Sequence, residues 1–227
     1  MEPGSSSSNP NPGAPAASSI YGERFTHRLE AFSDLVFGFS LSLLATRLDI
    51  PAKASEVFET TRWATFIVTF GTICAIWLSH YRIFRHRFVA RTPDVIVNFI
   101  FLLGIAVLPY SVQIFLRFTA ASHVIVLYLG DFALVMAALA TLRWRALRQR
   151  RDDPDAEVRL REWRGTVRQY ILVLIIIGFL VAMNAELIPA AKFFSFLPAA
   201  IVIVTLGTRL SVRRLPGFLA ATQGEQS

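Results

Sequence analysis

The sequence has little charge and almost no cysteine. Only 17% of its 227 residues are charged, while 54% are hydrophobic, a balance too apolar for an ordinary soluble domain of this size. The single cysteine, Cys74, excludes a disulfide framework within the chain, and no group of His, Cys or carboxylate residues has the spacing of metal ligands. We therefore predict neither a metal site nor another cofactor, and an integral membrane protein is the class that this composition favours.

Several functional motifs are also missing. The sequence contains no phosphate-binding loop and no Gly-x-Ser-x-Gly elbow, and none of its apolar stretches presents a nucleophile and a base at a workable spacing, so an enzyme is the least favoured class. A net charge of +7 with a pI near 10.3 is not accompanied by any nucleic-acid-binding motif. Arginine retained in cytoplasmic loops during membrane insertion explains this charge, and we predict no nucleic-acid partner.

What the sequence does contain is a series of long apolar stretches. A membrane span needs about 20 mainly apolar residues, and six stretches meet this length. They cover residues 29–50, 62–81, 93–115, 122–142, 167–187 and 190–210. Pro189 separates the last two, because proline cannot continue the preceding helix. The sequence predicts an all-α, polytopic membrane protein with a six-helix domain at 23–214, a disordered cytoplasmic tail at 1–22 and a short C-terminal tail at 215–227.

The basic residues indicate the orientation of these spans. Eighteen of the 23 Lys and Arg residues lie on one side of the predicted membrane and five on the other. Basic residues favour the cytoplasmic side, so we expect a multi-pass protein of the cell membrane with both termini in the cytoplasm. The longest loop, 143–169, contains Asp153 followed by Pro154, a typical helix start, and predicts a cytoplasmic helix that runs into the fifth span. Its arginines would lie near lipid headgroups, and a sensor of anionic lipids is an alternative function for this loop.

The first span carries unusual polar chemistry. Arg28, Ser33 and Asp34 lie at its start, where charged groups are costly unless they have partners, and we favour contacts between helices as their role. Farther along, spacings of three or four residues place Phe39, Ser42, Leu43 and Thr46 on one helical face. Such a face suits either the wall of an ion path, with an apolar constriction beside a hydroxyl layer, or a close-packed helix interface.

Other spans also carry polar residues. His80 and Trp77 share one face of the second span, and Asn98 lies early in the third. A buried, hydrogen-bonded role is the simpler interpretation for His80, and a proton relay is the alternative. Further polar groups at membrane depth are Tyr110, Ser111, Gln113, Asp131, Asn184 and Glu186.

Three ordered motifs resemble a known family. Arg28, Phe32, Ser33 and Asp34 are similar to the Arg-x-x-x-Phe-Ser-Asp signature on the first helix of the potassium-channel family that includes the endosomal and lysosomal channel of animals and its bacterial relatives. Trp77 and His80 in Trp-Leu-Ser-His-Tyr-Arg-Ile-Phe resemble the end of that family's second helix. Asn98, followed by Leu-Pro-Tyr-Ser at 108–111, resembles its third helix.

This resemblance implies a six-helix subunit that assembles as a homotetramer, with the four first helices around a central path for potassium ions and, in some members, protons. It places the constriction at Phe39, a hydroxyl layer at Ser42 and the next apolar layer at Leu43. Arg28, Phe32, Ser33, Asp34, Trp77, His80 and Asn98 would be the signature and helix-locking residues. The sequence departs from the family pattern, because phenylalanine replaces the usual Ile or Leu at 39, serine replaces threonine at 42, and Thr46 and Arg47 replace apolar residues near the outer end.

The main hypothesis is therefore a passive, potassium-preferring cation channel in a lipid bilayer, with no enzymatic step. A proton-coupled carrier is the alternative from another class, with His80, Asp131 or Glu186 as the titrating group. The lack of a clear internal repeat counts against a carrier. A third hypothesis is a membrane scaffold that has the same fold but does not conduct.

Overall fold

The computed structural model is all-helical in the part of the chain that it describes, which comprises residues 17–46, 53, 60–85, 88–118, 121–149, 156–189 and 202–208. Five long helices make up most of it: α1 (Ala17–Thr46), α2 (Thr60–Phe84), α3 (Thr92–Arg117), α4 (Ser122–Gln149) and α5 (Ala156–Asn184). Residues 202–208 form a further short helical segment. By length and composition, all five long helices can cross a membrane.

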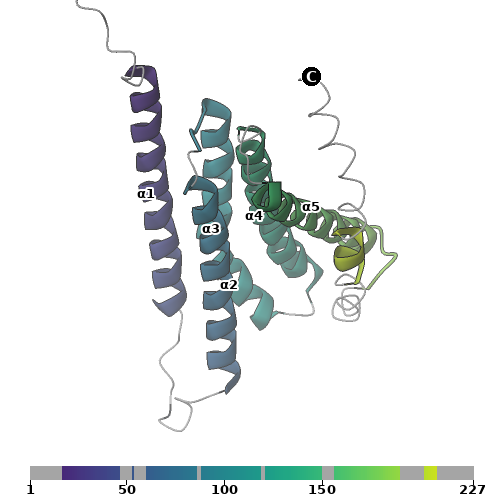
Figure 1. Cartoon of the computed structure of the whole chain (residues 1–227). Helices are drawn as coiled ribbons and strands as arrows, with labels where there is room; N and C mark the ends of the chain where they lie inside the picture. The colour runs from purple at the N-terminus through teal and green to yellow at the C-terminus, as the bar shows by residue number, and fades with distance from the viewer. Residues whose placement is uncertain are drawn as a thin grey trace, which may run out of the picture.

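The helices form a layered bundle with α1 at one edge (Figure 1). α3 is central, because α1 packs mainly against α3 and α2, while α4 packs against α3 and α5. α5 runs obliquely to the other helices in this view. One face of α1 is therefore occupied by its neighbours, and the opposite face is left open within the single chain.

The all-α membrane-type fold agrees with the sequence prediction, but the described residues bear out five long spans and not six. Most of the predicted sixth span, 190–210, lies outside the described residues, apart from the helical segment at 202–208. A β-carbon added at Gly207 would lie 2.8 Å from Cδ1 of Ile171, so this segment passes close to α5. The C-terminal tail at 215–227 and residues 1–16 of the N-terminal tail also lie outside the described part of the chain.

Four helices extend beyond their predicted spans at the same end of the molecule. α1 begins at Ala17, so residues 17–22 are helical, contrary to their assignment to the disordered tail. α2 continues to Phe84, α4 continues to Gln149, and α5 begins at Ala156, so a helix runs into the fifth predicted span as expected. The predicted helix start at Asp153 and Pro154 lies outside the described residues. Hydropathy marks only the part of a helix that faces hydrocarbon, and these extensions are rich in arginine.

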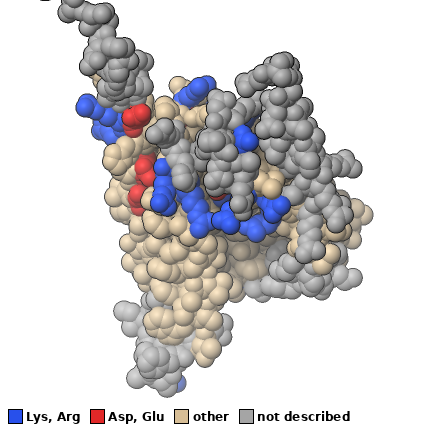
Figure 2. Space-filling view, viewed as in Figure 1, with Lys and Arg blue, Asp and Glu red and all other residues tan. Residues whose placement is uncertain are grey.

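Polar contacts hold these extensions together. The side chain of Arg145 in α4 pairs with Asp94, which is fully buried in the first turn of α3 and also accepts the backbone N–H of Arg91 at 2.9 Å. Gln149 exchanges two hydrogen bonds with the backbone of Val89, at 3.2 and 3.3 Å. Figure 2 shows most of the blue Lys and Arg side chains in the upper half of the molecule, above a broad surface without charge. This distribution is typical of a membrane protein with one strongly basic interface.

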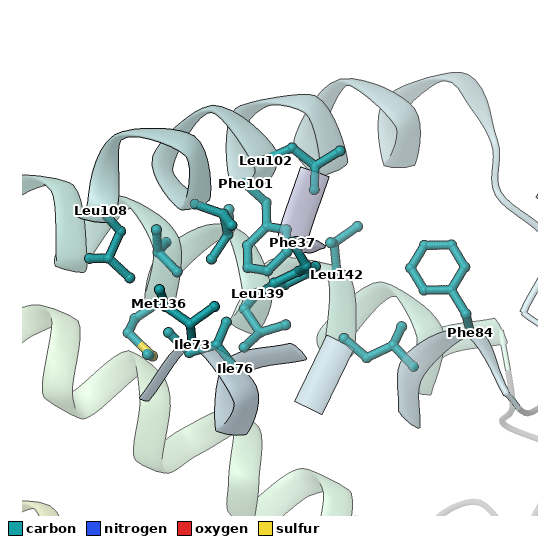
Figure 3. Close-up of a cluster of buried hydrophobic side chains, with 14 of the residues drawn as sticks. Phe37, Ile73, Ile76, Phe84, Phe101, Leu102, Leu108, Met136, Leu139 and Leu142 are labelled. Atoms are coloured by element: carbon teal, nitrogen blue, oxygen red, sulfur yellow. The ribbon is translucent and has the colours of Figure 1, made fainter. Parts of the chain in front are cut away.

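The core joins the first four helices (Figure 3). Phe37 of α1, Ile73 of α2, Phe101 of α3 and Leu139 of α4 are each at most 2% exposed and belong to one buried cluster. Because lipid is as apolar as these side chains, close packing and polar contacts between helices must supply most of the association energy. The polar contacts that this requires are concentrated around α1.

Candidate functional site

The two faces of α1 have different environments. Leu29, Ser33, Phe37, Ser40 and Leu44 are all buried against the bundle. The opposite face is exposed and carries the four residues that the sequence suggested for an ion path: Phe39 (67% exposed), Leu43 (42% exposed), Ser42 and Thr46. α1 thus has one face fixed to its own subunit and one apolar and hydroxyl-bearing face available to a neighbour or to an aqueous path.

A buried chain of hydrogen bonds joins α1, α2 and α3. The side-chain amide of Asn98 in α3 donates to Oγ of Ser33 in α1 at 3.0 Å, and its oxygen lies 2.8 Å from Nε2 of His80 in α2. All three side chains are at most 1% exposed. Ser33 also donates to the carbonyl of Leu29 at 2.8 Å, and the ring of His80 stacks on Phe101 with 5.0 Å between centroids. Asn98 is the centre of this junction, because it is the residue that bonds to both neighbouring helices.

A second polar contact fixes α1 to α2. The indole Nε1 of Trp77 donates to a carboxylate oxygen of Asp34 at 2.8 Å, and the Trp77 ring stacks on Tyr81 with 5.8 Å between centroids. Phe32 contacts Phe99 of α3 edge-on, with 5.9 Å between ring centroids. Arg28 lies exposed on α1, outside the buried junction. Six of the seven residues suggested as helix-locking thus make contacts between α1 and α2 or α3, in three separate sets, and Arg28 lies exposed outside them.

Sequence reasoning missed Ser40, which donates a hydrogen bond that α3 lacks because of a proline. Pro109 lies inside α3 and has no N–H to donate to the carbonyl of Ile105, four residues earlier. The hydroxyl of Ser40 donates to this carbonyl across the helix interface at 3.0 Å. Within a membrane a freed carbonyl needs such a partner, and a serine of a neighbouring helix is a common solution. Pro109 was the available signal, because it identifies the orphaned carbonyl as that of Ile105.

The exposed hydroxyls of α1 are oriented by their own helix. Oγ of Ser42 donates to the carbonyl of Gly38 at 2.9 Å, and Oγ1 of Thr46 donates to that of Leu43 at 2.9 Å. With each hydroxyl proton directed at the backbone, the oxygen lone pairs remain free to accept from water or to contact a cation. Phe39 precedes Ser42 on this face, and Leu43 lies between Ser42 and Thr46. Along α1, this face therefore alternates apolar side chains, which favour dewetting, with hydroxyl groups, which can contact a cation.

The titrating groups suggested for a carrier lie in three separate places. Besides His80 in the junction, Asp131 of α4 is buried and accepts a hydrogen bond from Ser111 of α3 at 2.8 Å. Glu186 lies just beyond the end of α5 with a positive φ of 58°, where the N–H of Leu187 reaches back to the carbonyl of Ala182 at 3.0 Å. Asp131 and Ser111 connect α3 to α4, which is a structural role.

Comparison with solved structures identifies this arrangement. The crystal structure of a variant of the potassium channel MtTMEM175 matches 80% of this chain and 93% of its own, with a TM-score of 0.61 at 17% identity. The fold is that of the TMEM175 channels. A TMEM175 homologue from Chamaesiphon minutus, described as a lysosomal potassium-selective channel, matches 72% of this chain and 97% of its own, with a TM-score of 0.51 at 22% identity.

Sequence comparisons point to the same family. Residues 28–109 match the family described as the endosomal/lysosomal potassium channel TMEM175, and this segment contains all eleven candidate site residues. A potassium channel of Streptomyces collinus is 30% identical over 132 residues, which are 53% of this chain and 61% of that channel. A potassium channel of Chamaesiphon minutus is 33% identical over 78 residues, 30% of this chain and 36% of that channel. The similarity thus spans less than two thirds of each curated relative and supports a relationship to bacterial TMEM175-type channels.

Proposed function

We propose that the protein is a passive, potassium-preferring cation channel with no enzymatic step. The observation that carries the proposal is the open face of α1, which presents Phe39, Ser42, Leu43 and Thr46 while the opposite face is fixed to α2 and α3. The match of residues 28–109 to a potassium-channel family supports it. In the proposed assembly, four copies place their α1 helices around a central ion path, and this homotetramer is the functional unit.

The proposed conduction mechanism uses the alternation along α1. Rings of Phe39 and Leu43 form narrow apolar layers that are dry when closed, so an ion must shed water to pass them. The hydroxyl oxygens of Ser42 and Thr46, whose protons are directed at backbone carbonyls, offset part of this dehydration cost. Potassium holds its water less tightly than sodium does, so such a path favours potassium. Protons are a second permeant species in this proposal, because transient water chains can fill an apolar constriction.

The helix-locking residues have a mechanical role in this proposal. An ion path made by a single helix from each subunit requires that helix to keep its rotation, since a turn of about 100° moves the next residue into the path. The Ser33–Asn98–His80 chain and the Trp77–Asp34 bond hold two consecutive residues of α1, which point in different directions around the helix, to α3 and to α2. Phe32, the residue before them, packs against Phe99 of α3. We assign Arg28 to the contact with a neighbouring subunit, because it lies exposed at the start of this segment.

The proposal includes the remaining features of the membrane topology. Residues 190–210 form a sixth span, which returns the chain to its starting side, and both termini lie in the cytoplasm of a cell-membrane protein. The segment 23–214 is then the channel domain, and 1–22 and 215–227 are its flanking tails. The asymmetric arginine distribution supports this orientation.

Potassium flux tests the function directly. The purified protein in liposomes should collapse a potassium gradient in the presence of a proton ionophore, and Phe39→Ala should increase the flux about tenfold by widening the constriction, equivalent to about 1.4 kcal/mol of barrier. Leu174→Ala is the matched control, because Leu174 on α5 is also 67% exposed but distant from the path in sequence and element. Absence of flux in both the wild type and Phe39→Ala would contradict the channel proposal, and flux that saturates and requires a proton gradient would favour the carrier.

Cross-linking tests the assembly. In a Cys74→Ser background, Phe39→Cys should form disulfide-linked dimers under mild oxidation, because the proposed path brings the four copies of this position together. Leu174→Cys should stay monomeric under the same conditions. Equal cross-linking of both variants would contradict a central α1, whereas a tetramer without flux would identify the scaffold.

A further inference from the structure

At the basic end of the bundle, Arg143 lies within electrostatic range of two further arginines, one on each of two other helices. Arg143 near the end of α4 experiences the charge of Arg168 on α5 and of Arg82 at the end of α2, and one acidic group, Glu162 of α5, opposes them. Arg82 and Arg168 are exposed, whereas Arg143 is only 8% exposed. The four groups together carry an excess of two positive charges.

Glu162 neutralises Arg143 only in part. Their nearest atoms, Nε of Arg143 and Oε2 of Glu162, lie 3.3 Å apart, but Nε has no well-aligned hydrogen bond to any residue that the structure describes. A β-carbon at Gly165 would lie 2.5 Å from Nη1 of Arg143, so glycine leaves the space on α5 that the guanidinium occupies. The chain therefore holds a buried, incompletely paired guanidinium between α4 and α5, with two exposed guanidinium groups beside it.

Tryptophans indicate the depth of this cluster. Trp144 and Trp163 contact each other across α4 and α5 with 5.2 Å between ring centroids, and the guanidinium of Arg148 lies 5.6 Å from the Trp144 ring. The indole Nε1 of Trp163 is buried without a hydrogen-bond partner among the described residues. Tryptophan prefers the membrane–water interface, the level at which lipid phosphates lie. The contact between these two tryptophans therefore indicates that the arginine cluster lies at this level.

We propose that Arg82, Arg143 and Arg168 form a binding site for the phosphate of an anionic phospholipid. The exposed guanidinium groups of Arg82 and Arg168 would contact the phosphate oxygens, while Arg143 supplies a fixed positive charge beneath them. The surrounding sequence supports an anion over a cation, because residues 143–168 contain nine arginines and five acidic residues. This site is independent of the ion path on α1, so it does not rest on the proposed channel activity.

Lipid titration of the purified full-length protein tests the site. Native mass spectrometry would measure the affinity for phosphatidylglycerol, with phosphatidylcholine as the lipid of zero net charge. Each arginine near a membrane surface contributes about fivefold to the binding of an anionic lipid, so the double variant Arg82→Gln/Arg168→Gln should lose about 25-fold in affinity for phosphatidylglycerol. Both side chains are exposed, which favours a folded variant, and the thermal unfolding midpoint would verify folding.

Arg24→Gln is the matched control, because Arg24 is exposed at the same end of the molecule on α1, outside the cluster. It should keep its affinity within about twofold. An equal loss in both variants, or no loss in the double variant, would overturn the site and indicate diffuse attraction. Inorganic phosphate distinguishes the source of the ligand: if millimolar phosphate displaced phosphatidylglycerol, the site would be one for a free anion, whereas retention of the lipid supports a headgroup site.

Discussion

At the residue scale, Asn98 connects three helices through one side chain. Substitution by alanine removes its bonds to Ser33 and His80 and leaves two buried polar groups without these partners. Hydrogen bonds within membrane proteins contribute about 0.6 kcal/mol each on average, and unpaired buried groups add to the loss. We therefore expect Asn98→Ala to lower the free energy of unfolding by about 1 to 2 kcal/mol. Thermal unfolding in detergent measures this, with exposed Asn184→Ala as the control; equal midpoints for the two variants would contradict the role of Asn98.

Ser40 and Pro109 form a pair whose coupling is measurable. Ser40→Ala should destabilise the protein by about 1 kcal/mol, because it removes the hydroxyl that donates to the carbonyl of Ile105. In a Pro109→Ala background residue 109 regains an N–H for this carbonyl, so Ser40→Ala should then cost less than half as much. A double-mutant cycle of unfolding free energies isolates the coupling. Additive effects would show that Ser40 does not compensate for the proline.

At the element scale, the contact between α3 and α4 depends on a glycine. A β-carbon at Gly104 would lie 2.5 Å from Cγ2 of Val135, which is fully buried. Gly104→Ala should therefore separate the two helices and destabilise the protein by about 1 to 3 kcal/mol. Gly178→Ala on α5 is the control, because its added methyl group would have no neighbour within 4 Å. Unfolding midpoints of the variants measure these effects. The double variant Gly104→Ala/Val135→Ala should be more stable than Gly104→Ala alone, and if it were not, the destabilisation would not arise from a clash with Val135.

The elements were predictable from the sequence to different degrees. Hydropathy located the apolar part of each long helix, because a span must be continuously apolar. It did not locate the helix ends: α4 extends through Arg143 and Arg145 to Gln149, where pairing with Glu162 and Asp94 replaces apolar burial as the stabilising interaction. These partners are distant in sequence, so no local pattern indicates them.

The site was predictable in composition but not in its connections. Helical spacing alone places Phe39 and Ser42 on a common face of α1, and the structure leaves that face open. Spacing could not show that Asn98 is bonded to Ser33, 65 residues away, or that Arg28 lies outside the junction. Ser40 was also overlooked, because the need for its hydroxyl arises from a proline on another helix. A single sequence specifies which groups need partners, and only the fold specifies which partner each group has.

At the scale of the whole molecule, arginine defines one end. Besides those at the end of α4 and the start of α5, exposed arginines at this end include Arg24 near the start of α1 and Arg85 after α2. Lys53 lies in the connection between α1 and α2, which is at the opposite end of these helices (Figure 1). Since positively charged segments are retained in the cytoplasm, we expect the α2–α3 connection inside the cell and the α1–α2 connection outside. The termini and the proposed lipid site would then be cytoplasmic.

Cysteine labelling tests this orientation in intact cells. In a Cys74→Ser background, Lys53→Cys should react with a membrane-impermeant maleimide added outside, and Arg85→Cys should react only after the membrane is permeabilised. Both positions are exposed, so a difference in reactivity reports sidedness and not burial. Arg85→Cys removes one of eighteen basic residues on its side, too small a change to reverse the bias. The reverse labelling pattern would mean that the topology is inverted and that this chain is an exception to the positive-inside rule. Labelling of both positions from outside would indicate two orientations in the same membrane.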